Sequence, residues 1–414
     1  MKTTAKGVLQ TGGEQVAVGV DPSRNALQLA ILAPHGTTTK RFPLVPASLA
    51  SIDAVLGQGQ GVRIGIEGAA TCGAMVLLHW LRQGYDIREV NPQISKRLRE
   101  CLTESHTDIS DAQGLAWSVR FHPHLPKVRL TVTTAAWKRL SRLRARLVKA
   151  RTGLYNRLHS LLAESYGAVY KRLFPNLKSK RALEFFQAFP TLDDALDDLP
   201  QVRSLLGEER ARLLEEAGRW GEGLYLETLR LEICLTIQLI FAHRTAIEGV
   251  GAKMAELSQA DPQVGRLRAV PGMGTTLALT ILGHSGDFSR FESHDAYAAY
   301  CGLAPAVWQS GQSRVYAKRR RRYSRPLKQA FLQLALTQLR LNPESRAYYE
   351  RKRREGKPHW VALIALARQL CKKVYKLMAE KAPPNPPLDI DGWPSCVPGA
   401  SPASPPRGRP AGRE

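Results

Sequence analysis

The chain has 414 residues, of which 43% are apolar, so we expect two or three folded units rather than a disordered protein. Its 60 lysines and arginines exceed its 36 acidic residues, which gives a formal net charge of +24 and a pI near 10.1. Such a charge is typical of a protein that binds a polyanion, and the dense runs of basic residues favour nucleic acid over an acidic membrane.

Membrane, secreted and zinc-binding classes are not expected. No apolar run reaches the ~18 residues that span a bilayer, and the first 15 residues lack the apolar centre of a secretory signal. The six cysteines contain no CxxC pair, so neither a zinc site nor a disulfide framework is predicted. We therefore expect a cytoplasmic protein that does not enter a membrane.

Residues 13–130 are predicted to form an α/β domain. Three strand patterns, QVAVGVD, ALQLAIL and TTTKRFPLV, follow one another and indicate an antiparallel meander. A helix over 48–56, a strand VRIGIEG, a helix over 70–82, a strand DIREV and a helical stretch after Ile94 come next. This order of strands and helices is that of ribonuclease-H-like (RuvC-like) domains.

Residues 131–260 show no strand pattern and are predicted to form a long helical hairpin, or coiled coil. Leucines at near-heptad spacing mark its first arm: Leu140, Leu143, Leu147, Leu154, Leu158 and Leu161. The same arm is basic, with no acid between residues 138 and 157. We expect a phosphate-contacting ridge that includes Arg139, Arg142, Arg146 and Lys149, although a solvated helix face is the alternative.

Residues 261–380 are predicted to form a third, mainly helical unit, and residues 381–414 a disordered proline-rich tail. The turn PGMG, with Gly272 and Gly274, lies between two apolar helical stretches and resembles a helix-hairpin-helix, whose backbone N–H groups can hold a phosphate. An ordinary helix-helix turn remains the alternative.

Two basic clusters in the third unit suit contacts with a nucleic-acid backbone. The second is the run 351–354, and a solubilising helix face is the alternative for both. The first cluster supplies the candidate contacts Arg314, Lys318, Arg319, Arg320, Arg321 and Arg322.

Four carboxylates are predicted to converge at one edge of the first domain. Asp21 ends the first strand, Glu67 ends a strand expected beside it, and Asp108 and Asp111 share one face of a helix. Gathered acids repel one another unless a hard cation neutralises them, and oxygen-only ligands suit Mg²⁺ or Mn²⁺. Two such ions favour phosphodiester cleavage or transfer. An actin-like sugar kinase or ATPase is the alternative on this fold, but the basic charge and the lack of a second glycine-rich loop disfavour it.

The acidic segments VGVDPSRN, IGIEGAAT and TDISDAQGLA resemble the three acidic motifs of DEDD-type insertion-sequence transposases. Downstream, LRAVPGMGTTLALTIL and YCGLAPAVWQSGQS resemble that family's second conserved region, so the resemblance covers roughly residues 15 to 380. It implies a RuvC-like domain, a coiled-coil domain and a C-terminal transposase domain.

The resemblance also implies a mechanism and partners. Family members use a structured bridge RNA to pair donor and target DNA, and act as homo-oligomers, here a dimer or tetramer. Carried over by motif, Asp21, Glu67, Asp108 and Asp111 would bind Mg²⁺, and Ser310 would attack the phosphate and hold the strand covalently.

Two features depart from the family pattern. His106 stands where a basic residue commonly precedes the Thr-Asp pair, and a basic run stands after Ser310 where many members have a glycine-containing turn. Two other functions stay open on the sequence alone: a hydrolytic junction nuclease that uses the same acids with water, and a non-catalytic nucleic-acid-binding protein.

Overall fold

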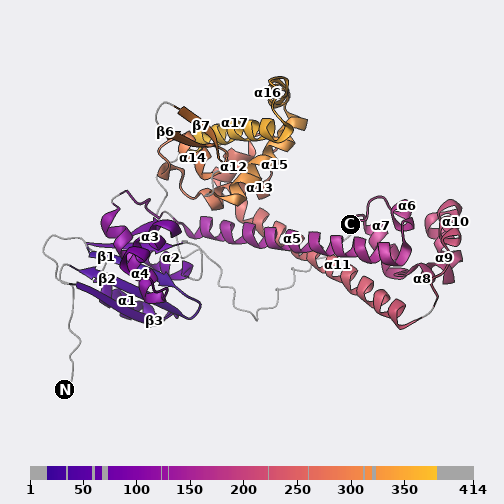
Figure 1. Ribbon diagram of the computed structural model, residues 1–414, viewed down its shortest axis with the longest axis horizontal. Coiled ribbons are helices and arrows are strands. Elements are labelled where there is room, and N and C mark those ends of the chain that lie inside the picture. The colour runs from indigo at the N-terminus through magenta and orange to yellow at the C-terminus, as the bar shows by residue number, and fades with distance from the viewer. Residues whose placement is uncertain are drawn as a thin grey trace, which may run out of the picture.

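The computed structural model describes most of the chain and divides it into three units joined by long helices (Figure 1). The side chains of residues 102 and 306–318 lie outside the description, as do Arg319 to Arg322 and the predicted tail over 381–414. The described residues are 16–33, 36–57, 61–67, 73–122, 124–128, 130–221, 223–259, 261–310, 313–318 and 323–379.

A five-stranded sheet with the order β3-β2-β1-β4-β5 forms the N-terminal unit. The first three strands are antiparallel neighbours, which confirms the predicted meander, and β4 and β5 continue the sheet in parallel with β1. The strands are β1 (Val16–Pro22), β2 (Ala26–Ala33), β3 (Gly36–Pro43), β4 (Val62–Glu67) and β5 (Asp86–Val90).

Helices cover both faces of this sheet, and two of them form the site described below. Side chains of α1 and α2 pack in one apolar cluster with the sheet, and side chains of α4 pack in a second cluster on the other face. The predicted start of α2 at Ala70 falls among residues that are not described. The helices are α1 (Ser48–Leu56), α2 (Ala74–Arg82), α3 (Pro92–Leu102) and α4 (Asp108–Phe121).

Two glycines allow α4 to lie directly on the strands. Gly19 of β1 and Gly65 of β4 are paired in the parallel register. A Cβ atom at Gly19 would stand 1.9 Å from the carbonyl oxygen of Ala112, and one at Gly65 would stand 2.3 Å from a methyl group of Val119. Glycine is therefore required at both positions, because any side chain would push the helix off the sheet.

The middle unit is a helical hairpin, as predicted, with no strand among the described residues between 131 and 257. Leu158 and Leu161 of the predicted leucine series are buried, but Leu143 is 42% exposed. Leu143 is exposed because α5 buries no residue between Ser141 and Tyr155, in the segment that connects the core of the C-terminal unit with the core at the distal end of the hairpin. The long arms are α5 (Val132–Tyr166) and α11 (Leu224–Ser258).

Five short helices join these arms and pack a second core with their distal halves, and this core includes contacts between phenylalanine rings. They are α6 (Val169–Leu173), α7 (Lys180–Ala188), α8 (Leu192–Asp197), α9 (Leu199–Leu206) and α10 (Glu208–Ala217).

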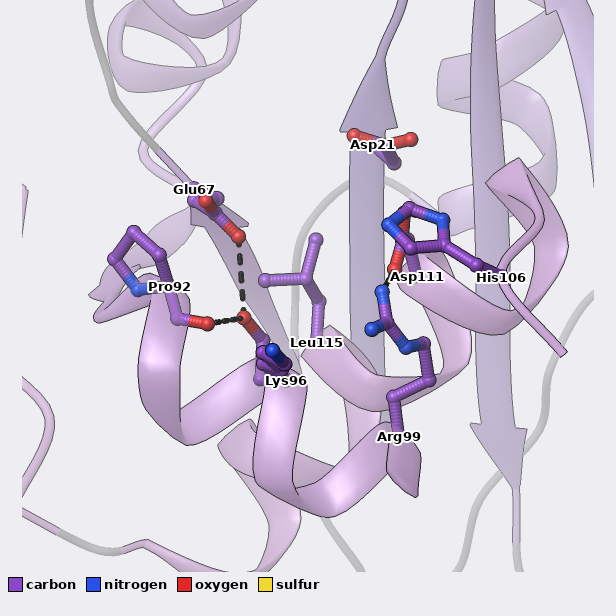
Figure 2. A pocket seen from close by; sticks show the side chains of 9 residues that line it. Asp21, Glu67, Pro92, Lys96, Arg99, His106, Asp111 and Leu115 are labelled. Atoms are coloured by element: carbon purple, nitrogen blue, oxygen red, sulfur yellow. Dashed lines mark hydrogen bonds and ion pairs between the residues drawn. The ribbon is translucent and has the colours of Figure 1, made fainter. Parts of the chain in front are cut away.

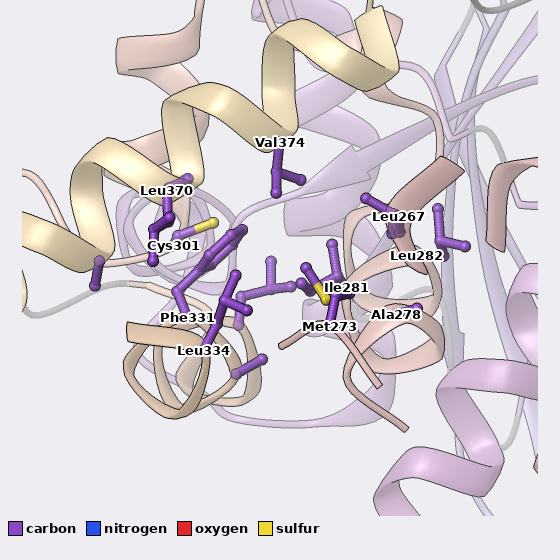
Figure 3. Packing of buried hydrophobic residues seen from close by; sticks show 14 of the residues in the cluster. Leu267, Met273, Ala278, Ile281, Leu282, Cys301, Phe331, Leu334, Leu370 and Val374 are labelled. Atoms are coloured by element: carbon purple, nitrogen blue, oxygen red, sulfur yellow. The ribbon is translucent and has the colours of Figure 1, made fainter. Parts of the chain in front are cut away.

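The C-terminal unit is mainly helical, with one antiparallel strand pair that the sequence did not predict. Its core includes Met273, Phe331 and Leu370, and also takes in Trp137 of α5 and Met254 of α11 (Figure 3). The hairpin base and the third unit thus share one core. The elements are α12 (Pro262–Arg268), α13 (Thr275–Ser285), the 3-10 helix η1 (Phe288–Arg290), α14 (His294–Tyr300), β6 (Ala306–Ser310), β7 (Ser313–Lys318), α15 (Arg325–Leu341), α16 (Pro343–Arg354) and α17 (His359–Ala379).

An ion pair joins the first and third units. The guanidinium of Arg290 lies 3.3 Å from the carboxylate of Glu89 in β5 and within 5 Å of the ring centroids of Phe291 and Tyr300. In the described part of the chain, no helix is both long and apolar enough to cross a membrane.

Candidate metal centre and nucleic-acid contacts

Three of the four predicted acids line one pocket of about 390 Å³ at the edge of the sheet (Figure 2). Asp21 and Glu67 reach it from the strands, and Asp111 reaches it from α4. The other lining residues are Pro92, Ser95, Lys96, Arg99, His106 and Leu115. The pocket therefore combines carboxylates from three separate segments with basic side chains from α3 and from the loop before α4.

The sheet register places the two strand acids side by side. Val20 of β1 pairs with Ile66 of β4 in parallel, so Asp21 and Glu67 follow at the same level. Each acid also stands two residues after the glycine of its strand, and residues two apart point to the same face. The acids thus face the side of the sheet on which α4 lies.

The start of α4 fixes the third acid. Thr107 caps the helix, because its hydroxyl accepts from the N–H of Ser110 at 3.1 Å while the Ser110 hydroxyl accepts from the N–H of Thr107 at 2.9 Å. Asp111 then sits in the first helical turn and lines the pocket. Asp108 stands in the same turn but is exposed and is not part of the lining.

The pKa of Asp21 is raised from 3.8 to about 6. Burial is the largest cause, and the negative charges of Asp111, Asp108 and Glu67 add to it, while His106 opposes the shift. The charges of the other three predicted acids therefore all act on Asp21, including that of the exposed Asp108. This is the behaviour of carboxylates gathered without a cation between them.

Three polar neighbours hold the acids in place. Ser95 Oγ donates to Glu67 Oε2 at 3.1 Å, Arg99 forms an ion pair with Asp111, and His106 Nδ1 lies 3.5 Å from Asp111 Oδ2. Arg99 is only 9% exposed, so its charge is largely removed from water. Sequence analysis missed Ser95 and Arg99, although their spacing of four residues on the amphipathic α3 puts both on one helix face.

The donor set suits a hard divalent cation but is not closed around one. All its candidate ligands are carboxylate oxygens, which Mg²⁺ and Mn²⁺ prefer. Among the described residues, no three His, Cys, Asp or Glu side chains already stand close enough to hold one ion. Arg99 engages Asp111 Oδ1, so this ion pair would compete with a cation for that carboxylate.

Ser310, the predicted nucleophile, lies elsewhere in the chain. It ends β6 and pairs with Ser313, the first residue of β7. This strand pair belongs to the C-terminal unit and lies apart from the five-stranded sheet (Figure 1). Ser310 therefore does not lie beside the acids, and its side chain is among those not described, as are those of Arg314 and Lys318.

The predicted basic ridge on α5 is exposed. Arg139, Arg142, Arg146 and Lys149 all face solvent at spacings that keep them on one side of the helix. Arg157, farther along, instead pairs with Glu232 of α11 at 2.6 Å, so the hairpin supplies an acid that α5 lacks between residues 138 and 157.

The predicted helix-hairpin-helix turn does join two helices. Gly272 adopts a left-handed conformation with φ of 77°, and a Cβ atom there would stand 2.8 Å from Thr337 of α15. Gly274 is the N-terminal cap of α13 and is exposed. Gly272 thus has a packing role at this turn, whereas a Cβ atom at Gly274 would meet nothing within 4 Å, and phosphate binding there stays a prediction.

Two segments of the chain match models of known protein families. Residues 18–166, which hold all four acids, match the DEDD model described as "Transposase". Residues 264–350, which hold Ser310, match the model described as "Transposase IS116/IS110/IS902 family".

Proteins of bacterial insertion elements are similar to the chain. An uncharacterized 42 kDa protein of element IS900 from Mycobacterium paratuberculosis is 29% identical over 34% of this chain and 36% of its own length. An uncharacterized 43.6 kDa protein of IS110 from Streptomyces coelicolor is 28% identical over 35% of each chain. The transposase of IS1111A from Coxiella burnetii is 22% identical over 72% of this chain and 71% of its own.

The first two similarities thus span only about a third of those relatives, whereas the third runs through most of both chains. Both family models occur here in one chain, and the first covers the strands and helix that gather the acids. In both segments the chain is therefore similar to transposases of the IS110/IS116/IS902 family.

Proposed function

We propose that this protein is a DNA transposase that cleaves and rejoins strands at the ends of an insertion element and at its target. The observation that carries the proposal is the meeting of Asp21, Glu67 and Asp111 in one pocket, within the segment that matches the DEDD transposase model. The strand order around the pocket supports a ribonuclease-H-like domain. The exposed basic ridge on α5 supports DNA as a partner.

The proposed cofactor is Mg²⁺, with Mn²⁺ as a substitute. Asp21, Glu67 and Asp111 would hold it, and Asp108 would join them or act through its charge. When bound, the ion stabilises charge on the attacking and leaving oxygens of a phosphoryl displacement. Arg99 would neutralise Asp111 until then, which keeps the acids together in the folded chain.

The proposed nucleophile is Ser310. Its Oγ would lose a proton and bond to phosphorus while the P–O bond of the DNA strand breaks, so one strand end leaves as a hydroxyl. The new phosphoserine ester keeps the energy of the broken phosphodiester. A hydroxyl of another strand can then displace the serine and rejoin DNA without an external energy source.

Serine and acids lie in different units, so the proposal requires them to meet. A rearrangement within one chain, or assembly of two or four copies, would bring the C-terminal unit of one to the sheet of another. We further propose that a structured bridge RNA pairs the DNA substrates. The basic residues of α5 and of the third unit would grip its phosphates.

The deciding experiment tests for a covalent protein–DNA adduct. The protein is incubated with Mg²⁺, with DNA carrying the element's ends, and with RNA transcribed from the flank of its gene. Denaturing electrophoresis should then show DNA bonded to the protein, and Ser310→Ala should lose this species. Ser313→Ala is the matched control, because Ser313 pairs directly with Ser310 across the turn, and it should keep the adduct.

The adduct also separates this function from its nearest alternative. A hydrolytic junction nuclease would use the same acids with water as the nucleophile, and would cut DNA without bonding to it. Cleavage by Ser310→Ala at the wild-type rate, with no adduct from the native chain, would replace the transposase mechanism with the nuclease one.

A further inference from the structure

The turn between α16 and α17 carries an exposed indole. Trp360, the second residue of α17, is 62% exposed, and its neighbour Val361 is 47% exposed. The next two residues, Ala362 and Leu363, are fully buried and fix the helix to the core. The indole is therefore held on a rigid element at the outer part of the unit, where α16 lies away from α5 (Figure 1).

An aromatic network orders this indole. The ring of His359 packs edge-on against Trp360, with centroids 5.1 Å apart. His359 is fixed in turn, because its Nδ1 lies 2.7 Å from the hydroxyl of Tyr349 in α16. A side chain that is already ordered loses little entropy when a ligand stacks on it, so this arrangement is prepared for binding.

The turn that precedes the indole carries an excess of positive charge. Arg353 donates to the carbonyl oxygen of Lys357 at 2.7 Å, which ties the end of α16 across the turn. Arg354 and Lys357 are both exposed, and neither forms an ion pair within 4 Å among the described residues, although the charge of Lys357 acts on Glu355, which pairs with Lys352. Residues 343–360 contain six lysines and arginines and three glutamates. The turn thus offers free cations beside a flat apolar ring.

We propose that Trp360 is a stacking platform for an unpaired nucleotide, with Arg354 and Lys357 contacting the adjoining phosphates. Every base has a π-face that an indole can cover, and exposed cations suit a phosphate chain. The base must be unpaired, because stacking in a duplex covers its faces. The proposal rests on the nucleic-acid chemistry proposed above, and adds a specific site to it.

The chemistry of the turn favours nucleic acid over a protein partner. A stable protein interface buries about 800 Å² on each side, whereas a tryptophan and a valine supply only about 200 to 300 Å² of apolar surface. The side chains around them are charged and predominantly basic. Single-stranded RNA and single-stranded DNA share the required chemistry, so the test includes both.

The test measures the affinity of the full chain for labelled single-stranded RNA, single-stranded DNA and duplex DNA by fluorescence anisotropy over a salt series. Trp360→Ala should weaken single-strand binding roughly five- to hundredfold and leave duplex binding within about twofold. Trp360→Phe should keep most of the affinity. A larger loss for RNA or for DNA identifies which strand supplies the nucleotide, and either result supports the site.

Salt dependence separates stacking from charge. Trp360→Ala should leave unchanged the slope of the logarithm of the binding constant against the logarithm of the salt concentration. The double variant Arg354→Ala, Lys357→Ala should reduce the steepness of this slope by about 1.4, which is about 0.7 for each lost phosphate contact. Trp220→Ala is the matched control, because Trp220 is 65% exposed but lies in the middle unit, where its indole N–H donates to the carbonyl oxygen of Ser165 at 2.6 Å. It should leave all three affinities unchanged.

Two results overturn the inference. In the first, Trp360→Ala binds single strands with the wild-type affinity. In the second, Trp360→Ala loses affinity equally for single strands and for the duplex, which would mean that Trp360 does not stack on an unpaired base. Thermal unfolding of Trp360→Ala at the wild-type temperature shows that a loss of affinity is not a loss of fold. If the native chain binds none of the three nucleic acids, the proposed function itself fails.

Discussion

The acidic edge of the sheet and the basic α16–α17 turn handle charge in opposite ways. At the sheet edge, carboxylates from three segments are half-buried, and Ser95, Arg99 and His106 limit their positions. At the turn, Arg354 and Lys357 are exposed and unpaired among the described residues. Close, half-buried like charges call for a small cation of defined geometry, whereas exposed and separated charges suit a long polyanion.

This contrast predicts that the two regions can be disabled separately. Asp21→Asn or Glu67→Gln should reduce Mg²⁺-dependent strand cleavage by about a thousandfold or more, because each removes a proposed metal ligand. Binding of DNA and RNA should remain within about twofold of the wild type, since the exposed cations are untouched. Cleavage assays and anisotropy measure the two effects. Full cleavage by both variants would contradict the metal assignment.

The acidic edge also depends on a close contact between the backbones of β1 and α4 at Gly19. Gly19→Ala should destabilise the fold by about 3 kcal/mol, because its Cβ would meet the backbone of α4 at 1.9 Å and overpack the sheet. Gly153→Ala is the matched control. No atom stands near its Cβ position in α5, so it should stabilise the chain by about 0.5 to 1 kcal/mol.

Chemical denaturation measures both glycine variants. If Gly19→Ala proves as stable as the wild type, then α4 does not rest on β1, and the route by which Asp111 reaches Asp21 is wrong. The assay thus tests the fold beneath the site without any nucleic acid or metal.

Sequence patterns predicted the acidic edge well because it is built from local signals. The strand meander is confirmed, as is the adjacency of the strands that carry Asp21 and Glu67, and Asp108 and Asp111 lie in one helix as expected. Each depends on alternation, turn residues or capping within a few positions. Gly19 and Gly65, two residues before the strand acids, also indicate the face of the sheet on which a helix packs closely.

The remaining features depend on contacts between distant residues. The pairing of Arg99 with Asp111 joins two helices across a loop, and the core shared by Trp137 and Met273 joins residues 136 positions apart. Trp360 reads in the sequence as one more apolar position of a helix. Only the packed structure distinguishes it from Leu363, three residues on and fully buried.

Replacing Arg99 tests whether its ion pair with Asp111 competes with Mg²⁺ for that carboxylate. Arg99→Gln should strengthen Mg²⁺ binding by about tenfold, because breaking a charged hydrogen bond to Asp111 costs about 1.5 kcal/mol that the ion no longer has to offset. The same variant should unfold at a lower temperature in a chelator, where Asp111 has lost its partner.

Lys96→Gln is the control for Arg99→Gln, because Lys96 lines the same pocket but its side chain is 61% exposed and pairs with Glu100. Its Mg²⁺ affinity should change by less than about twofold, as expected of an exposed ion pair. Calorimetry with the metal alone measures both variants. Weaker Mg²⁺ binding by Arg99→Gln would mean that Arg99 supports the metal site instead of competing with it.

The smallest expected effect is the pH dependence of the acidic edge, which follows from the pKa of about 6 at Asp21. The folded chain keeps this proton up to about pH 6, whereas the unfolded chain loses it near 3.8. Between these values the folded state binds more protons, so the contribution of Asp21 to stability is present at low pH and is lost as pH rises through 6.

Mg²⁺ must displace the same proton, so its affinity should rise about tenfold per pH unit below 6 and level off above it. Calorimetric titration at pH 5 in two buffers of different ionisation enthalpy should reveal about one proton released per ion bound, and none at pH 7.5. Equal affinity and no proton release at both values would show that Asp21 is not a ligand.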